Sequence, residues 1–250
     1  MSRKMPRGRF AVSHERAHEL ARVNGANRVL YFLLRLVLVP VTRLFFGLTA
    51  TGTERIPATG PVVIAPNHKS FWDAFFIAAV VRRPVHFMGK AELFEGWRGR
   101  LFVALGGFPV RRGDSDEFAI DTSRAILERG EVLALFPEGT RVPDPDRLGV
   151  PRRGAARLAI ETGAPVVPTA ITGTEKRRFH LPRRVRIAFG EPVPVTDLSP
   201  TPEHAGLLTQ QTLWPTISEE YTRLKAAPGV VAAGLAAAGL GYLVARRRRR

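Results

Sequence analysis

The 250-residue sequence contains no cysteine. This absence excludes disulfide bonds, zinc sites built from thiolates and a cysteine nucleophile. Acidic residues are also in deficit, because 22 of them stand against 38 lysines and arginines, for a formal charge of +16 at pH 7. A field of this sign favours anionic partners such as nucleic acid, acidic lipid headgroups or phosphorylated substrates. Arginine-rich codon usage would produce the same charge, so the charge alone does not identify the partner.

Long uninterrupted apolar runs are scarce as well. Residues 1–10 are basic and have no apolar core beside them, so no secretory signal peptide is expected. The first apolar run, residues 28–49, carries Arg35 near its middle and then Pro40. A charge at the centre of a spanning helix costs roughly 2.5–3.5 kcal/mol. We therefore expect two short amphipathic helices in the membrane interface, with Arg28 and Arg35 on one face reaching the headgroups. A buried helical hairpin is the alternative.

A second apolar run lies near the end of the chain. Residues 229–245 have no charge but are rich in alanine and glycine, and Arg246 to Arg250 follow them. The run could span a membrane with the arginines on the cytoplasmic side, or it could belong to a basic tail that adsorbs to acidic lipid. No aromatic residues interleave with the arginines, so no nucleic-acid partner is expected.

Between these two runs, strand and helix patterns alternate from residue 52 onward. Short apolar stretches such as "PVVIAP", "PVHFMG" and "APVVPTAITG" are typical of buried strands, and stretches with helical periodicity separate them. We expect an α/β fold with a single mixed sheet flanked by helices and an N-terminal amphipathic helical hairpin. The expected parts are a basic segment with membrane-interface helices (1–50), the α/β domain (51–226) and the apolar tail (227–250).

The segment "HERAH", from His14 to His18, matches the H-E-x-x-H pattern of zinc proteases. Two histidines four apart share a helix face and could bind zinc, with Glu15 as base. The match lies near the start of the sequence, before any expected strand, and no third ligand is apparent. We therefore expect a solvated polar helix capped by Ser13 and no metal, with a zinc hydrolase as a minor alternative.

The stretch "VVIAPNHKSFWDAFFIAAVV" places His68 and Asp73 between two apolar runs. On one regular helix, residues five apart would be separated by about 140°. If His68 lies in the loop after a strand at 61–66 and the helix begins at Ser70, Asp73 in the first turn can reach the imidazole. A carboxylate there would fix the tautomer and raise the basicity of the other ring nitrogen. The alternative is that Asp73 caps its own helix and His68 only packs.

Two further strand ends carry polar residues. "FPEGTR", residues 136–141, follows a strand, and its Gly139 lets backbone N–H groups approach a ligand closely. "GFPVRRG", residues 107–113, carries arginines, which bind phosphate in strong bidentate pairs. Ligands of open α/β sheets bind at such strand ends. A base, a turn of backbone donors and phosphate-binding arginines are thus expected at one edge of the sheet.

The segments "NHKSFWD", "GFPVRRG", "FPEGTR" and "VVPTAITG" stand in the order and approximate spacing of the four blocks of the glycerophospholipid acyltransferases. Over residues 50–200 the sequence resembles this family, and in particular its 1-acylglycerol-3-phosphate (lysophosphatidic acid) acyltransferases. Single blocks are weakly specific, whereas four blocks in order are strongly so. The second block departs slightly, with Pro109 and Val110 where larger apolar residues are common and Arg111 where an acidic residue is common.

The resemblance implies roles for individual residues. His68 is the expected general base, and Asp73 is the carboxylate that orients it. The residues expected to bind the acceptor phosphate are Arg112, Glu138, Gly139, Thr140 and Arg141. Lys90 matches a basic position found in many members.

The implied reaction moves a fatty acyl group from acyl-CoA or acyl carrier protein to the hydroxyl of a lysophospholipid, giving phosphatidic acid from 1-acylglycerol-3-phosphate. A backbone N–H near Gly139 would stabilise the oxyanion, and no cofactor or metal is needed. The expected location is the cytoplasmic face of the cell membrane, on an anionic surface. Two alternatives stay open: an acyltransferase for another lyso-lipid, such as an aminolipid or glycolipid precursor, and a catalytically silent membrane-binding relative.

Overall fold

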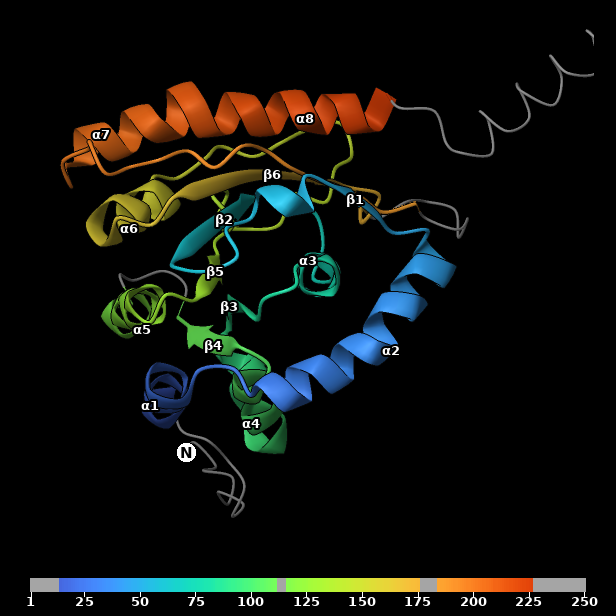
Figure 1. The fold of residues 1–250 in the computed structure, drawn as a ribbon, viewed down its shortest axis with the longest axis vertical. Coiled ribbons are helices and arrows are strands. Elements are labelled where there is room, and N and C mark those ends of the chain that lie inside the picture. The colour runs from blue at the N-terminus through green and yellow to red at the C-terminus, as the bar shows by residue number, and fades with distance from the viewer. Residues whose placement is uncertain (1–13, 112–115, 176–183, 227–250) are drawn as a thin grey trace, which may run out of the picture.

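A computed structural model describes residues 14–111, 116–175 and 184–226 of the chain (Figure 1). The predictions for Arg112 and for the tail at 229–245 lie outside the described residues. Within them, the chain forms one seven-stranded sheet with helices on both faces. The predicted α/β fold with a single mixed sheet is confirmed.

The sheet has the strand order β1-β7-β6-β2-β5-β3-β4. In chain order the strands are β1 (Thr49–Thr51), β2 (Val62–Pro66), β3 (Val85–Lys90), β4 (Gly107–Val110), β5 (Val132–Ala134), β6 (Val166–Thr172) and β7 (Arg186–Phe189). The pair β6 and β7 is antiparallel, and the other neighbouring pairs are parallel. Strands β2 to β6 consequently all end at the same edge of the sheet. The short strand β1 was not predicted from the sequence.

Alternate residues of the central strand β2 face opposite sides of the sheet. Val63 and Ala65 join one apolar cluster, whereas Val62 and Ile64 join another. The helices over the first cluster are α1 (His14–Asn24), α5 (Glu117–Glu128), α6 (Gly154–Thr162), α7 (Pro202–Leu207) and α8 (Trp214–Ala226), and those over the second are α2 (Arg28–Phe46) and α3 (Asp73–Val80). Strands covered on both faces read as continuous apolar runs, which is why β2, β5 and β6 could be located from the sequence.

Two connecting regions complete the described chain. A 3-10 turn (Ala91–Phe94) and α4 (Gly96–Ala104) join β3 to β4 at one end of the sheet. Near the end of the described chain, a π-helical stretch (Leu208–Leu213) separates α7 from α8.

The prediction of two short helices over residues 28–49 is wrong, because the structure has the single helix α2 there. It is one helix of 19 residues with Pro40 inside it, capped by the side chain of Asn27 and ended by Gly47 at a φ of 52°. Proline removes one N–H and its ring crowds the carbonyl four residues back. Leu38 and Phe46, on either side of the proline, nevertheless pack against the same apolar cluster. Tertiary packing therefore keeps the helix continuous where local propensity predicts a break.

Helix α2 lies at the outside of the fold (Figure 1), and the side chains exposed along it are mainly apolar. Its large side chains with exposed fractions between 38% and 79% are Val29, Phe32, Leu33, Leu36, Val37, Val41, Leu44 and Phe45. By length and composition, α2 is the one described helix that could cross a membrane. The same face would also suit a helix that lies in the membrane interface.

Arg35 does not extend along this outward face. Its guanidinium donates to the carbonyl oxygens of Arg82 at 2.9 Å and Ala79 at 3.2 Å, at the C-terminal end of α3. Carbonyls at the end of a helix lack partners within it, and the helix dipole favours a cation there. The expectation that Arg35 reaches the headgroups is therefore wrong, because this arginine ties α2 to α3.

Helix α1 is present as predicted, but it is not a solvated polar helix. Ala17, His18 and Ala21 are buried, and α1 packs against α5 and α4. The buried side chains form a narrow face of two alanines and one histidine, which is too short a stripe to stand out in the sequence pattern.

Candidate active site

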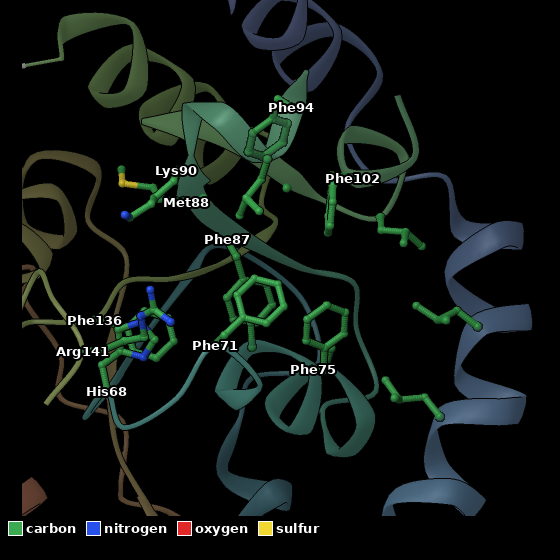
Figure 2. Close-up of a pocket in the computed structure, with 18 of the residues that line it drawn as sticks. His68, Phe71, Phe75, Phe87, Met88, Lys90, Phe94, Phe102, Phe136 and Arg141 are labelled. Atoms are coloured by element: carbon green, nitrogen blue, oxygen red, sulfur yellow. The ribbon is translucent and has the colours of Figure 1, made fainter. Parts of the chain in front are cut away.

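Loops that carry predicted functional residues meet where β2, β5 and β3 end (Figure 2). These strands are neighbours, because β5 pairs in parallel with both β2 and β3. The loop after β2 and the turn after β5 are joined by a hydrogen bond from the Val142 N–H to the His68 carbonyl, at 2.8 Å. His68, Lys90 and Arg141 line one cavity at this edge.

His68 and Asp73 form a direct hydrogen bond. The distance from His68 Nδ1 to Asp73 Oδ2 is 2.9 Å, and the Asp73 side chain is fully buried whereas that of His68 is 13% exposed. His68 lies in the loop after β2, and Asp73 is the first residue of α3. With Nδ1 protonated and donating to the carboxylate, the Nε2 lone pair is free to accept a proton.

The same carboxylate oxygen also organises the backbone. Asp73 Oδ2 accepts from the N–H groups of Lys69 at 2.7 Å and Ser70 at 2.8 Å. One oxygen atom therefore both orients the imidazole and holds the turn that precedes α3. The alternative that Asp73 caps its own helix does not hold, because the N-terminus of α3 has no side-chain cap.

Besides its hydrogen bond to Asp73, the imidazole of His68 contacts an aromatic ring. Phe136 stacks on it with ring centroids 3.8 Å apart and planes 21° from parallel. Phe136 follows β5, whereas Asp73 begins α3. The stacked ring and the hydrogen bond together restrict rotation and displacement of the His68 imidazole. Contacts from two separate elements therefore set the position of this imidazole.

The contacts of Glu138 favour a positioning role over the predicted phosphate-binding role. Its carboxylate is buried and accepts from the backbone N–H of His68 at 2.6 Å and of Gly149 at 2.7 Å. Burial raises the pKa of this carboxyl group, because removal from water disfavours its charge. A carboxylate occupied by two backbone donors, and repelled by a phosphate, is better suited to hold the loop of His68.

Gly139 adopts a φ of 64°, in the left-handed region that glycine enters readily. Its N–H donates to the carbonyl of Phe136 at 3.0 Å, which closes the turn. An oxyanion donor near Gly139, as predicted, would therefore have to be a neighbouring amide, and those of Thr140 and Arg141 come next in the turn.

Arg152 is a site residue that the sequence reasoning missed. A Cβ atom added to Gly139 would lie 3.3 Å from Arg152 Cδ and Nε, so the arginine side chain passes directly over the turn. The available signal was the pair Arg152 and Arg153 at the start of α6, where the helix dipole disfavours a cation. Among the described residues, no ion pair involves Lys90, Arg141 or Arg152.

The cavity beside His68 is apolar for most of its length. It has a volume of about 200 Å³ and lies between α2, α3, β3 and α4 (Figure 2). Its apolar lining includes Leu34, Leu38, Phe75, Phe87, Met88 and Phe102. A narrow apolar space that ends at an imidazole and two cations can hold a chain whose reactive group is polar.

A buried lysine supports the loop from behind. Lys69 Nζ donates to the carbonyl oxygens of Asp144, at 2.8 Å, and Arg147, and it lies 4.7 Å from the centre of the Tyr221 ring. Burial lowers the pKa of the Lys69 ammonium group. Lys69 therefore fastens the loop after β2 to the segment after the "FPEGTR" turn and to α8.

His14 and His18 lie on α1 and do not line this cavity. They are nevertheless accompanied by a carboxylate that the sequence spacing did not reveal, because Asp116 at the start of α5 lies beside them. The prediction that no third ligand-type residue is present is wrong.

The chain belongs to the acyltransferase family, because the family model described as acyltransferase matches residues 47–172. This segment runs from just before β1 to the end of β6 and includes His68, Asp73, Lys90, Glu138, Arg141 and Arg152.

Individual relatives carry a more specific name. A 1-acyl-sn-glycerol-3-phosphate acyltransferase of Bacillus subtilis (strain 168) is 29% identical over 169 residues, which cover 66% of this chain and 83% of the relative. The mouse 1-acyl-sn-glycerol-3-phosphate acyltransferase alpha is 28% identical over 189 residues, covering 71% of this chain and 66% of the relative. The crystal structure of the 1-acyl-sn-glycerophosphate acyltransferase of Thermotoga maritima has the same fold, with a TM-score of 0.64 at 22% identity over 80% of this chain and 83% of that one.

Glu138→Gln tests the positioning role. A glutamine amide can accept from one of the two backbone N–H groups but presents a donor to the other, so the His68 loop should loosen. We expect kcat for acyl transfer to fall about 10-fold or more, with acceptor KM within about 3-fold, and stability to fall by about 1–3 kcal/mol. Steady-state kinetics and denaturant unfolding measure these effects, with Glu128→Gln on the exposed side of α5 as the control. A change confined to acceptor KM would instead point to direct contact with the acceptor.

Proposed function

We propose that the protein transfers a fatty acyl group from an acyl thioester to the free hydroxyl of 1-acylglycerol-3-phosphate, producing phosphatidic acid. The observation that carries the proposal is the setting of one imidazole: His68, hydrogen-bonded to Asp73, opens on an apolar cavity that Lys90 and Arg141 also line. A base, an apolar groove and cations at one point suit a lipid that carries both a hydroxyl and a phosphate. The names of the bacterial and mouse relatives support this choice of acceptor.

The chemical step follows from the orientation of His68. The acceptor hydroxyl gives its proton to His68 Nε2 while its oxygen attacks the thioester carbonyl carbon. The resulting imidazolium is stabilised by the Asp73 carboxylate, and the oxyanion by an amide of Thr140 or Arg141, a contact worth roughly 3–4 kcal/mol in other enzymes. The C–S bond then breaks, the carbonyl re-forms, and the thiolate takes the proton from the imidazolium.

The acceptor phosphate is assigned to the cations around the mouth of the cavity. Arg141 lies in the turn next to His68, Lys90 ends β3, and Arg152 crosses Gly139. Arginine binds phosphate through two parallel hydrogen bonds, which would hold the glycerol hydroxyl at a fixed distance from the base. Arg112 lies outside the described residues, and its assignment to the acceptor phosphate rests on the family resemblance alone.

The acyl chain of the donor, from acyl-CoA or acyl carrier protein, is assigned to the apolar cavity. Each buried methylene contributes about 0.8 kcal/mol, so a cavity of this kind favours a chain over water. Its walls include Leu34 and Leu38 from the inner side of α2, whose outer side is the exposed apolar face. We place that outer face in the cytoplasmic leaflet of the membrane, where the formal charge of +16 favours an anionic surface.

A panel of acceptors tests the proposed reaction. Purified full-length protein is supplied with 1-acylglycerol-3-phosphate, a lysophospholipid with an esterified phosphate, and a monoacylglycerol, each with acyl-CoA and with acylated carrier protein. We expect the highest kcat/KM for 1-acylglycerol-3-phosphate. A preference for another acceptor would overturn the assignment of the substrate, and the lack of transfer to any acceptor would favour a catalytically silent relative.

His68→Ala and Asp73→Asn test the base and its orienting carboxylate. Loss of a general base costs typically 10²–10⁴-fold in rate, so both variants should lose nearly all transfer while remaining folded. Asparagine at 73 can still accept from the N–H groups of Lys69 and Ser70 but cannot stabilise an imidazolium. Turnover and circular dichroism measure the outcome. If Asp73→Asn keeps near-normal kcat while His68→Ala is inactive, Asp73 acts on the backbone alone.

Arg141→Ala tests the phosphate contact. Because the arginine meets the acceptor phosphate before and during reaction, its removal should raise acceptor KM about 10-fold or more and leave kcat nearly unchanged. The matched control is Arg157→Ala, an arginine on the exposed side of α6 that pairs with Glu161. An acceptor KM equal to that of the control would give Arg141 a structural role only.

Serine substitutions on α2 test the membrane face. Replacing Phe32, Leu36 and Phe45 removes three exposed apolar side chains, each contributing roughly 1.5–3 kcal/mol when buried. Partitioning onto zwitterionic vesicles, which offer the basic segments no attractive charge, should fall at least about 100-fold in a sedimentation assay. A control variant with serine at Val150 and Leu207, exposed apolar residues elsewhere, should bind as the wild type does. Equal binding of both variants would place the anchor outside α2.

A further inference from the structure

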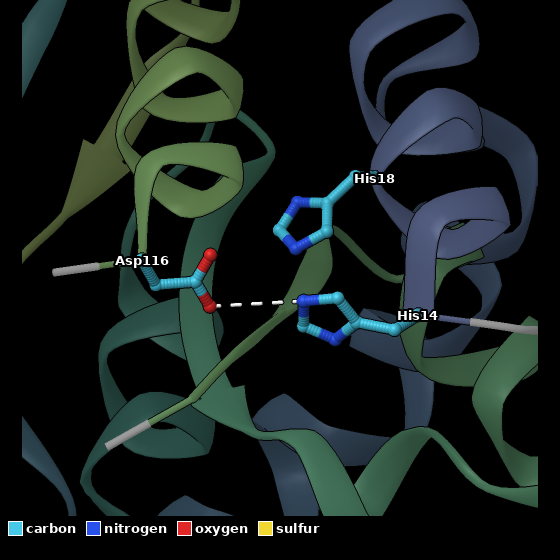
Figure 3. Close-up of side chains that lie close together, drawn as sticks. All are labelled: His14, His18 and Asp116. Atoms are coloured by element: carbon cyan, nitrogen blue, oxygen red, sulfur yellow. Dashed lines mark ion pairs between the residues drawn. The ribbon is translucent and has the colours of Figure 1, made fainter. Parts of the chain in front are cut away.

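A second cluster of ligand-type side chains lies away from the cavity, between α1 and α5 (Figure 3). His14 and His18 are one turn apart on the same face of α1, and Asp116 is the N-cap residue of α5. One potential ligand atom from each of the three residues lies within 4.8 Å of those of the other two. The cluster therefore joins the first described helix to a helix that begins far along the chain.

The most deeply buried member has one nitrogen anchored and one without a partner. His18 is fully buried, and its Nδ1 lies 2.8 Å from the hydroxyl oxygen of Thr122, which also accepts from Arg22 Nε. With a proton on Nδ1 donated to Thr122, the lone pair of Nε2 faces the cluster. That Nε2 has no hydrogen-bond partner among the described residues. Metal-binding histidines are typically fixed in this way, with the second ring nitrogen donating to a neighbour.

Neither His14 nor Asp116 forms a hydrogen bond with this lone pair, and the two residues do not form one with each other. Both ring nitrogens of His14 lack hydrogen bonds to described groups, and its Nε2 is 3.7 Å from Asp116 Oδ2, beyond hydrogen-bond distance. The two imidazoles meet edge to face, with ring centroids 4.6 Å apart. Buried polar atoms almost always have partners, so imidazole nitrogens that lack them and converge beside the Asp116 carboxylate point to a ligand between the three residues.

The protonation state of the histidines agrees with this geometry. Burial and the neighbouring His14 lower the pKa of His18 to about 4, and burial and the charge of Arg111 lower the pKa of His14. Neutral imidazole is the form that binds metal ions. The same Arg111 and Arg22 charges disfavour a cation, so the affinity should be below that of sites without nearby arginines.

We propose that His14, His18 and Asp116 bind one zinc ion, with water as the fourth ligand. Two imidazoles and one carboxylate suit zinc, whereas magnesium and calcium prefer oxygen ligands throughout. Zinc bonds of about 2.0–2.1 Å place tetrahedral ligand atoms roughly 3.3 Å apart, so separations that are all within 4.8 Å need to shorten by at most about 1.5 Å around the ion. The His14 side chain is 14% exposed, which leaves a route for the ion and for the water.

The bound ion would act as a clamp. Asp116 Oδ2 also accepts from the Arg111 N–H at 2.7 Å, directly after β4, and Asp116 Oδ1 caps α5 through Ala119 N. A zinc ion on this carboxylate would fasten α1 to the end of β4 and to the start of α5. The effect falls on stability rather than on the acyl-transfer step, because none of these residues lines the cavity of His68.

Zinc titration of the full-length protein tests the proposal. The protein is prepared without an affinity tag, stripped with a chelator, and titrated with zinc and separately with magnesium in a calorimeter. We expect one zinc ion per chain with a Kd in the micromolar range or below, and no magnesium binding. At free zinc about 100 times Kd, the midpoint of thermal unfolding should rise by roughly 5–10 °C.

Three matched variants locate the ion. His14→Gln and His18→Gln should each weaken zinc binding about 10-fold or more and abolish the rise in unfolding temperature, whereas His204→Gln, on α7, should change neither. His14 is only partly buried, so its variant should fold even if the substitution at His18 does not. Absence of stoichiometric zinc binding, or equal binding by the His14 and His204 variants, would overturn the proposal.

Discussion

The site depends on one carboxylate oxygen that accepts three N–H groups. Asp73 Oδ2 receives the imidazole N–H of His68 and the backbone N–H groups of Lys69 and Ser70, at 2.7–2.9 Å. A fully buried carboxylate would carry a large desolvation cost, and three donors offset it. Because the donors are consecutive in sequence, the orientation of the His68 imidazole and the shape of the loop cannot change independently.

Glu138, which follows the neighbouring strand β5, makes a similar arrangement. The Glu138 carboxylate accepts the His68 N–H, and the Val142 N–H donates to the His68 carbonyl, so both sides of one residue's backbone are bonded to the segment after β5. The parallel pairing of β2 and β5 brings the two loops that hold His68 to the same edge of the sheet.

The parts of this structure that could be predicted are those decided locally. Strands β2, β5 and β6 are apolar runs buried on both faces, and the convergence of their carboxyl ends placed the His68 and "FPEGTR" loops at one edge. The failures were decided by distant partners. Pro40 is carried within α2 by packing on the core, Arg35 finds carbonyls on α3, and Asp116 approaches α1 from far along the chain. Contacts of this kind cannot be predicted from the spacing of residues in the sequence.

The structure also explains part of the excess of arginine over lysine. Arg83 alone donates to the carbonyl oxygens of Pro57, Gly60 and Gly130, and Arg35 and Arg186 likewise donate to backbone carbonyls. A guanidinium has five N–H donors and can satisfy several carbonyls where loops converge, which an ammonium group does less well. Some of the arginines that contribute to the formal charge of +16 therefore hold the fold together rather than forming a binding surface. The cations proposed to bind an anionic substrate are instead Lys90 and Arg141, which line the cavity beside His68, and Arg152, which crosses Gly139. These residues are few enough to be tested one at a time.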